Sequence, residues 1–150
     1  MKKSLKDYIF VSIQFLLFGL YAFEFLAKLE LPLLVQYFGL VVAFIGCLIS
    51  IVSVVQLNTN LTVFPTPKSA SFLITSGLYS FSRHPIYSGL ILFTFGYSVY
   101  QSSIYKFIIS LVLLILFYFK TQYEESQLQT KFHDYLEYKQ KVGRFFSKIK

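Results

Sequence analysis

Apolar runs of membrane-spanning length, separated by short polar segments, set the pattern of the chain. Residues 8–27 and 33–57 form the first two runs, and residues 86–119 form a third. An α-helix rises about 1.5 Å per residue, so a hydrocarbon core of about 30 Å takes roughly 20 residues. The third run is too long for one straight crossing and can fold back at residues 101–103. The pattern therefore predicts an all-α membrane protein with about four transmembrane helices, the last two forming a tight hairpin.

The chain becomes amphipathic after the last apolar run. Apolar residues recur at helical spacing between basic and acidic ones, and they include Leu128, Phe132, Tyr135 and Val142. A helix with one apolar and one charged face lies along a membrane surface or against the end of a helical bundle. We therefore predict a C-terminal amphipathic helix at the interface, where its basic residues would also favour anionic lipid headgroups.

Composition supports a membrane protein and argues against two other classes. Hydrophobic residues make up 55% of the 150 residues, charged residues make up 14%, and the mean hydropathy is +0.60. Soluble domains usually carry about 25% charged residues. The formal net charge is +7, but the basic residues cluster beside the apolar runs, so we expect no nucleic-acid partner. Cys47 is the single cysteine and lies inside an apolar run. We expect one domain over residues 1–150, surrounded by membrane lipids.

Lysine and arginine residues predict the orientation in the membrane. With four crossings, both termini and residues 58–85 lie on one side. That side holds all but two of the 14 Lys and Arg residues, the exceptions being Lys28 and Lys106. Basic residues are enriched on the cytoplasmic side, so we expect both termini and the 58–85 segment to be cytoplasmic. The lysines before the first apolar run are also typical of the start of a secretory signal peptide. The length of this run and the lack of a clear cleavage site favour a retained helix instead.

The sequence SGLYSFSRHPIYSG, residues 76–89, places costly polar groups at the edge of an apolar run. Arg83 and His84 stand directly before Pro85, and proline suits the first turn of a helix because its missing N–H is not needed there. Each of these residues alone has an ordinary structural role, such as an anchor at the interface. Their combination at this position indicates a functional site on the cytoplasmic side.

The predicted hairpin brings a second set of polar residues to the same place. The helical rise along its two legs puts His84 at nearly the same height as Glu124 and Glu125. Two glycines in the first leg, Gly89 and Gly96, are expected to let the two legs of the hairpin pack closely. We therefore expect a histidine, an arginine, tyrosines and two carboxylates to converge at the cytoplasmic interface.

Two segments resemble one family of integral membrane enzymes. LITSGLYSFSRHPIYSG, residues 73–89, resembles the signature region of the isoprenylcysteine carboxyl methyltransferase and phospholipid methyltransferase superfamily. EESQLQTKFHDYLEYKQKVGRF, residues 124–145, resembles the C-terminal block of that family, with its Glu-Glu pair and its Tyr-x-x-Tyr. The two blocks occur in the same order as in the family, and the resemblance covers roughly residues 58–146.

The resemblance implies a site for S-adenosylmethionine between membrane helices. The seven glycines of the chain include no G-x-G, which agrees with the absence of a glycine-rich nucleotide-binding loop. No metal is expected. By position in the family motifs, the residues expected to bind the cofactor are Leu73 and Ile74 through their backbone, Tyr79, His84, Pro85, Ile86 and Tyr87 around it, and Glu124 at its polar end.

The candidate catalytic residues are Lys120, Arg83 and Glu125. In the carboxyl methyltransferases of the family, an arginine at the position of Lys120 faces the acceptor carboxylate, and lysine keeps that charge but lacks the bidentate fork. A carboxylate acceptor is already ionised at neutral pH and needs only a cation to orient it. An amine acceptor has to lose a proton, for which His84, Glu124 or Glu125 are the candidates.

The sequence thus predicts an S-adenosylmethionine-dependent methyltransferase whose lipophilic acceptor enters from the bilayer. Carboxylate O-methylation is favoured because a cation at Lys120 attracts an anionic acceptor and repels a protonated amine. Phospholipid N-methylation is the alternative within the enzymes. A membrane subunit or transporter is the alternative outside them. A transporter is expected to carry ionisable groups at mid-bilayer depth, where only Glu24 and the glutamines come close.

Overall fold

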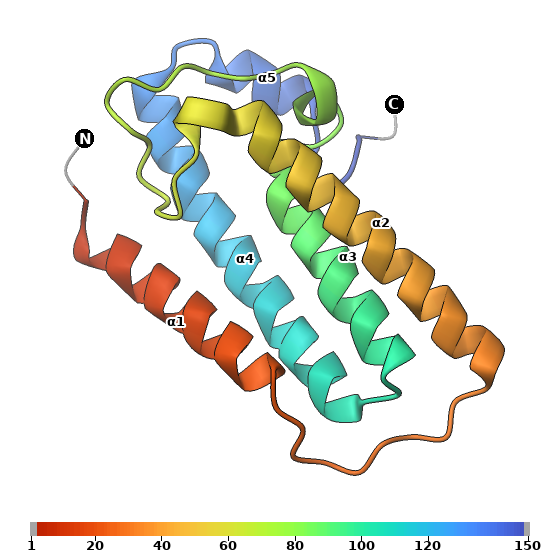
Figure 1. The fold of residues 1–150 in the computed structure, drawn as a ribbon. Coiled ribbons are helices and arrows are strands. Elements are labelled where there is room, and N and C mark those ends of the chain that lie inside the picture. Colours follow the sequence, from red (N-terminus) through yellow and green to blue (C-terminus); the bar gives the residue numbers. More distant parts are fainter. Residues whose placement is uncertain (1–2, 149–150) are drawn as a thin grey trace.

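The computed structural model describes residues 3–148, and all of its regular structure is helical. Figure 1 shows four long helices side by side and a short fifth helix across one end. Within residues 3–148 there is no β-strand, which confirms the all-α prediction. The elements are α1 (Leu5–Tyr21), α2 (Leu33–Leu57), α3 (Pro85–Tyr100), α4 (Ile104–Lys131), α5 (Tyr135–Lys141) and two 3-10 helices, η1 (Asn58–Asn60) and η2 (Gly77–Ser80).

Helices that pack together run in opposite directions, so each end of the bundle collects different segments (Figure 1). One end holds the start of α1, the end of α2, the start of α3 and the end of α4, and residues 58–84 and α5 cover it. We call it the loop end. The opposite end holds residues 22–32 and residues 101–103, and we call it the turn end. This arrangement gathers at the loop end the segments that the orientation argument placed on one side of the membrane.

α3 and α4 form the predicted hairpin. Residues 101–103 connect them, and Ser102 adopts a left-handed backbone conformation with φ of 51°. Ser103 then caps α4, because its hydroxyl oxygen accepts a hydrogen bond from the backbone N–H of Lys106 at 3.0 Å. The prediction that the long apolar run folds back at these residues is confirmed.

Glycines bring α2, not α4, into close contact with α3. A Cβ atom added to Gly39 would lie 2.7 Å from the carbonyl oxygen of Gly96, and one added to Gly46 would lie 2.6 Å from that of Gly89. Backbone at that distance cannot move aside, so only glycine allows this approach. The prediction that Gly89 and Gly96 pack the two legs of the hairpin together is therefore wrong. They face α2 because small residues recur on its matching face.

α1 is shorter than the apolar run that predicted it. The helix ends at Tyr21, six residues before the end of the run at residue 27. The Lys106 ammonium donates to the carbonyl oxygens of Tyr21 and Phe23, both at 2.8 Å. These bonds satisfy acceptors that the end of a helix leaves free. The buried positions of α1 form one face that contacts the rest of the bundle, and they are Asp7, Gln14, Leu17 and Tyr21.

The outer surface of the helices is strongly apolar. In α2, Leu34 is 82% exposed, Val55 71% and Phe38 68%. A surface of this kind is suited to lipid rather than water. The helical segments Leu33–Asn60 and Ile104–Lys131 are long and apolar enough to cross a membrane. α1 has 17 residues and α3 has 16, fewer than the roughly 20 that a full crossing takes. Four crossings therefore stay a prediction.

The C-terminal segment differs from the single amphipathic helix that we expected. α4 continues to Lys131, well past the end of the apolar run, and the chain breaks at residues 132–134 before the seven-residue α5. Tyr135, Tyr138 and Val142 are buried against Leu73, Leu128 and Phe132. α5 therefore packs on the loop end of the bundle, one of the two positions considered, while its place relative to a membrane stays a prediction.

Candidate functional site

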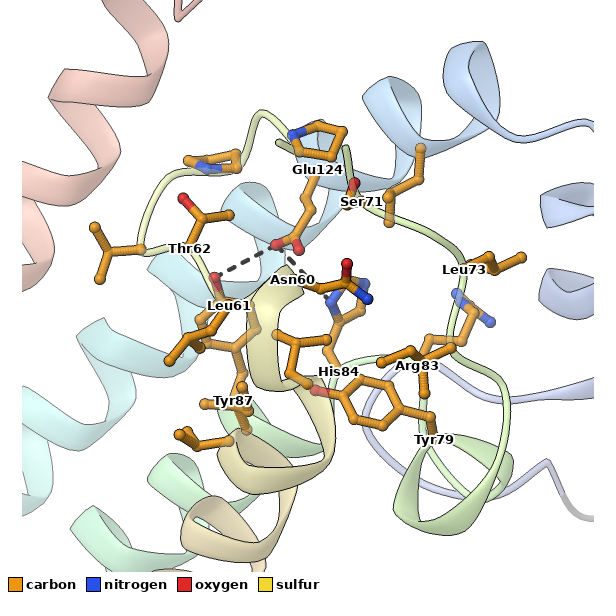
Figure 2. A pocket seen from close by; sticks show the side chains of 18 of the residues that line it. Asn60, Leu61, Thr62, Ser71, Leu73, Tyr79, Arg83, His84, Tyr87 and Glu124 are labelled. Carbon is orange, nitrogen blue, oxygen red and sulfur yellow. Dashed lines mark hydrogen bonds and ion pairs between the residues drawn. The ribbon is translucent and has the colours of Figure 1, made fainter. Parts of the chain in front are cut away.

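A cavity of about 320 Å³ lies inside the loop end. Its size falls at the lower end of the range typical of small-molecule sites, about 300–1,000 Å³. Apolar side chains form most of its wall, and a few polar groups converge on it (Figure 2). All four long helices contribute residues, together with the 58–76 segment and α5.

The segment that follows α2 forms one wall of the cavity because polar side chains hold it in place. The Asn60 amide donates to the carbonyl oxygen of Phe72 at 3.1 Å and accepts from its backbone N–H at 3.2 Å. The Asp7 carboxylate, at the start of α1, accepts from the backbone N–H of Thr66 at 2.9 Å and from its hydroxyl at 2.8 Å. From α4, the Lys131 ammonium donates to the hydroxyl oxygen of Ser71 at 2.6 Å. A long loop thus gains a fixed shape.

The next stretch of backbone offers free hydrogen-bonding groups beside the cavity. Leu73 and Ile74 line the cavity, and the hydrogen bonds found within residues 3–148 do not engage their backbone groups. Gly77 then turns the chain with φ of +61°, a conformation that glycine adopts without strain. The Gln56 side-chain oxygen accepts from the backbone N–H of Leu78 at 3.0 Å and fixes this turn to α2. The predicted contact of these backbone groups with the cofactor stays a prediction.

Three tyrosines from two elements, η2 and α5, border the cavity. Tyr79 is 6% exposed, and Tyr135 is 1% exposed. The Tyr138 hydroxyl donates to the carbonyl oxygen of Tyr79 at 2.5 Å and ties α5 to η2. Burial, which disfavours the charged form, raises the pKa of Tyr79 and Tyr135 well above that of an exposed tyrosine. Both phenols are therefore neutral and able to donate hydrogen bonds, and the Tyr135 hydroxyl has no partner among the described residues.

The start of α3 is joined to the C-terminal segment. His84 is the N-cap residue of α3 and Pro85 its first residue, as the sequence predicted. The backbone N–H groups of Arg83 and His84 donate to the carbonyl oxygens of Gly143, at 2.9 Å, and Arg144, at 3.1 Å. Residues after α5 thus pair with the backbone of the motif and hold the first turn of α3 in place.

Glu125 is the centre of a buried ion cluster. Its Oε1 atom accepts from the Arg83 guanidinium at 2.7 Å and lies 3.3 Å from His84 Nε2 and 3.3 Å from Arg144 Nε. The Lys139 ammonium lies 3.0 Å from Oε2. Arg83 also donates to the carbonyl oxygens of Lys139 and Val142. We name this set of five side chains, Arg83, His84, Glu125, Lys139 and Arg144, the ion cluster. It joins α3, α4, α5 and the C-terminal segment.

Glu124, the neighbour of Glu125, has a different environment. Figure 2 shows its carboxylate between Tyr87 and His84. The Tyr87 hydroxyl donates to Oε2 at 3.4 Å, and His84 Nδ1 lies 4.0 Å from the same atom. Both contacts are at the long limit for their kind. Within residues 3–148 no lysine or arginine pairs with this carboxylate. Glu124 therefore faces the cavity with hydrogen-bonding capacity to spare.

Lys120 lies one turn before Glu124 and extends the polar lining toward the middle of the bundle. It is 1% exposed. Its ammonium donates to Gln14 Oε1 at 2.5 Å and to the carbonyl oxygen of Val63 at 3.1 Å, and it lies 5.2 Å from the centre of the Tyr87 ring. Its two hydrogen-bond acceptors are neutral, and no carboxylate of the described residues lies within 4.0 Å of it. Lys120 therefore does not form an ion pair with Glu124, although the two residues are one helical turn apart.

The structure brings most of the predicted site residues together, but not all of them. Pro85 and Glu125 do not line the cavity: Pro85 lies in the first turn of α3 and Glu125 inside the ion cluster. A direct contact of Glu125 with reactants is thus not supported, because its carboxylate is already enclosed by four cationic or polar side chains. The residues that do line the cavity are Leu73, Ile74, Tyr79, Arg83, His84, Ile86, Tyr87, Lys120 and Glu124.

Several residues that line the cavity were not predicted from the sequence. Gln14 and Asn60 contribute amides, and Tyr135 and Tyr138 contribute phenols. For Gln14 a signal was present, since a glutamine inside a membrane-length apolar run is costly unless it binds a partner. For Asn60 no such signal was available, because it reaches the cavity only through the path of the loop. Tyr135 and Tyr138 form the Tyr-x-x-Tyr of the C-terminal block, but they reach the cavity only because α5 folds back over the bundle.

Comparisons with known proteins agree with this geometry. The family described as phospholipid methyltransferase matches residues 34–135, more than half of the chain. Among solved structures, the fold is similar to that of the eukaryotic intramembrane Ras methyltransferase ICMT (isoprenylcysteine carboxyl methyltransferase), with a TM-score of 0.71 and 21% sequence identity. The match covers 95% of this chain and 50% of that one, so the chain spans about half the length of the solved structure. No curated protein sequence matches. The chain belongs to the phospholipid methyltransferase family of membrane proteins.

Proposed function

We propose that this protein is an S-adenosylmethionine-dependent methyltransferase that acts on a lipophilic acceptor. The observation that carries the proposal is the cavity at the loop end, where an incompletely paired carboxylate, Glu124, lies one helical turn from a buried cation without a charged partner, Lys120. Opposite charges on one cavity wall suit two ligands of different charge, a cationic cofactor and a second reactant.

The residues of the cavity fit the cofactor. S-adenosylmethionine carries a sulfonium and an ammonium, so a carboxylate free of lysine and arginine partners, such as Glu124, complements it. The unpaired backbone groups of Leu73 and Ile74 suit the hydrogen-bonding edge of a planar base. The Tyr135 hydroxyl, buried without a protein partner, would gain one from a bound ligand.

The chemistry assigned to these residues is mainly alignment and the exclusion of water. S-adenosylmethionine supplies a methyl group whose bond to sulfur breaks as a new bond to the acceptor oxygen or nitrogen forms, leaving a neutral thioether. Such a displacement depends on holding the reacting atoms in line. His84 and Tyr87 orient Glu124 from one side. The loop segment and α5 lie across the loop end (Figure 1), and both contribute residues to the cavity wall, so we expect them to limit the access of water from the side that we predict to be cytoplasmic.

The acceptor that we favour carries a carboxylate. A carboxylate is ionised at neutral pH, so it needs orientation and no general base. Lys120 supplies an ammonium at the cavity that no acidic side chain of the described residues neutralises. Large apolar side chains cover the surrounding helices, which suits an acceptor that reaches the site from lipid.

N-methylation of a phospholipid headgroup is the second candidate, and the family match favours it. An amine acceptor must release a proton before or during the transfer. Glu124 and His84 lie at the cavity and could take it, since each has hydrogen-bonding capacity there. The two candidates differ in the charge of the acceptor and therefore respond oppositely to changes at Lys120.

Binding of S-adenosylmethionine to the purified protein, measured by titration calorimetry, tests the proposal. We expect Glu124→Gln and His84→Ala each to weaken binding about 5- to 150-fold, because each loses a charged or hydrogen-bonded contact worth about 1–3 kcal/mol. Glu137→Gln is the matched control: the Glu137 side chain is 68% exposed on α5, and its loss should not change binding. Equal affinities for all variants would overturn the assignment of the cavity.

Transfer of a labelled methyl group separates the two acceptors. The protein is supplied with the labelled cofactor and with acceptors of matched chain length that end in a carboxylate or an amine, and the product is identified by mass. We expect methyl transfer to the acid. Faster transfer to the amine would establish the phospholipid-type alternative, and no transfer to either, with intact cofactor binding, would overturn the acceptor class.

A further inference from the structure

Gln14 lies at the cavity although it belongs to a part of the chain that the family match does not include. The match begins at residue 34, whereas Gln14 is in the middle of α1. Its side chain is 8% exposed, lines the cavity and contacts Lys120 from the neighbouring helix, since α1 packs against α4. α1 is therefore more than a membrane anchor, since it contributes a polar group to the polar wall of the site.

The contact fixes which way the Gln14 amide faces. An ammonium can only donate hydrogen bonds, so the atom 2.5 Å from Lys120 Nζ has to be the amide oxygen. The amide nitrogen then points away from Lys120. Among the hydrogen bonds found in residues 3–148 none uses this nitrogen, so its two N–H donors are unpaired by protein. The third N–H of Lys120 is likewise unused, because two are engaged by Gln14 and Val63.

Lys120 and Gln14 therefore place unpaired hydrogen-bond donors side by side in this corner of the cavity. Lys120 contributes one N–H with a full positive charge, and Gln14 contributes neutral N–H groups beside it. A carboxylate has two oxygens that each accept hydrogen bonds, so it complements a pair of neighbouring donors. A protonated amine at these two side chains would meet hydrogen-bond donors and the positive charge of Lys120. A glutamate at position 14 would bind Lys120 equally well but would cancel its charge, and the glutamine avoids this.

We propose that Gln14 determines the charge specificity of the acceptor site: it holds Lys120 without neutralising it and, with Lys120, binds the carboxylate of an amphiphilic acceptor. This inference rests on the proposed function only where it calls the bound molecule a methyl acceptor. The anion site itself does not depend on methyl transfer. Gln14 acts as a specificity residue, while Lys120 supplies the charge.

Direct binding of a probe to the purified full-length chain in detergent tests the proposal without turnover. Binding of labelled palmitate is measured by scintillation proximity, with competition by unlabelled palmitate, palmitamide and hexadecylamine. We expect palmitate to compete at least about tenfold better than the amide or the amine, as fits the loss of one charge-assisted hydrogen bond. Gln14→Glu should lower palmitate affinity about tenfold or more and remove this preference. Gln14→Leu, which lacks both the donor and the new charge, should give a smaller loss.

Two controls make the result specific. Gln36→Glu places the same charge in α2, near the turn end, where the native amide only donates to the carbonyl oxygen of Leu31, and it should leave palmitate binding unchanged. Cofactor binding is measured on each variant and should not fall in Gln14→Glu, because this change leaves Glu124 in place and adds no positive charge to the cavity. Wild-type protein that does not distinguish palmitate from palmitamide, or a Gln14→Glu variant with unchanged preference, would overturn the proposal. Failure of the proposed methyl transfer would appear separately, as absent cofactor binding or turnover.

Discussion

The two ends of the helical bundle both contain buried charges, and at the loop end such charges line the cavity. At the turn end, Lys106 donates to two carbonyl oxygens at 2.8 Å and lies 3.9 Å from Glu24. Ser103 donates to the Glu24 carboxylate at 2.9 Å, and the 22–32 loop meets the hairpin turn where Leu29 N–H donates to the carbonyl oxygen of Ser102 at 2.7 Å. These charges have protein partners, and they serve to close the bundle.

The loop end contains both kinds of environment within two adjacent residues. Glu125 is 1% exposed and surrounded by the ion cluster, whereas Glu124 faces the cavity with only long contacts to Tyr87 and His84. The difference between the ends, and between these two carboxylates, teaches that a polar residue in an apolar chain indicates a ligand site only where its hydrogen-bonding capacity is left over. Three predictions test this comparison.

Breaking the ion cluster should have the largest effect on stability. Glu125→Gln removes the charge that compensates Arg83 and the other cations, and breaking a buried ion pair costs roughly 3–5 kcal/mol. We expect a large fall in Tm in detergent, and faster cleavage of the segment after α5 by protease, because that segment is held by Arg83 and its neighbours. Glu124→Gln is the matched control and should leave Tm nearly unchanged while it weakens cofactor binding. If the two variants lost the same stability, the division between the carboxylates would be wrong.

Disturbing the α2–α3 contact should have an intermediate effect and separates packing from charge. Gly46→Ala puts a methyl group 2.6 Å from the carbonyl oxygen of Gly89 in a place where both backbones are fixed. Overpacking of this kind costs about 1–3 kcal/mol, which we expect as a lower Tm.

Gly19→Ala provides the control for that change. A Cβ atom at Gly19 meets nothing within 4 Å, so the substitution should leave stability unchanged or raise it by about 0.5–1 kcal/mol through helix propensity. A Gly46→Ala protein as stable as the wild type would mean that α2 and α3 can separate without cost.

The smallest effect is expected at the turn end. Glu24→Gln removes a partly buried ion pair at 3.9 Å, in which the Lys106 side chain is 8% exposed and the Glu24 side chain 26%, but it leaves Lys106 its two carbonyl partners. Because the two charged atoms are 3.9 Å apart and Lys106 keeps its carbonyl partners, we expect this pair to contribute about 1 kcal/mol, so Tm should change little and cofactor affinity should not change at all. A loss of cofactor affinity comparable with that of Glu124→Gln would show that the two ends are coupled and that the comparison fails.

Some features of the site were predictable because they depend on distances along a single hairpin. The rise per residue places His84 level with Glu124 and Glu125 once the turn is known, and the structure has His84 within 4.0 Å of both carboxylates. The neighbours of each carboxylate were not predictable in this way. Lys139 and Arg144 reach Glu125 only because the chain breaks after Lys131 and α5 folds back over the bundle.

The sequence by itself determined the all-α fold, the hairpin turn and the end of the bundle where polar residues gather, since each follows from the length and period of apolar runs. Only the tertiary structure decided which face meets which helix. Gly89 and Gly96 face α2 rather than α4, Gln14 reaches Lys120 from another helix, and Glu124 rather than Glu125 borders the cavity. The physical reason is that helical periodicity fixes heights and faces within one element. Which helix packs against a given face depends on how closely two whole helices can approach each other. That distance depends on the side chains of both helices and is decided only in the folded structure.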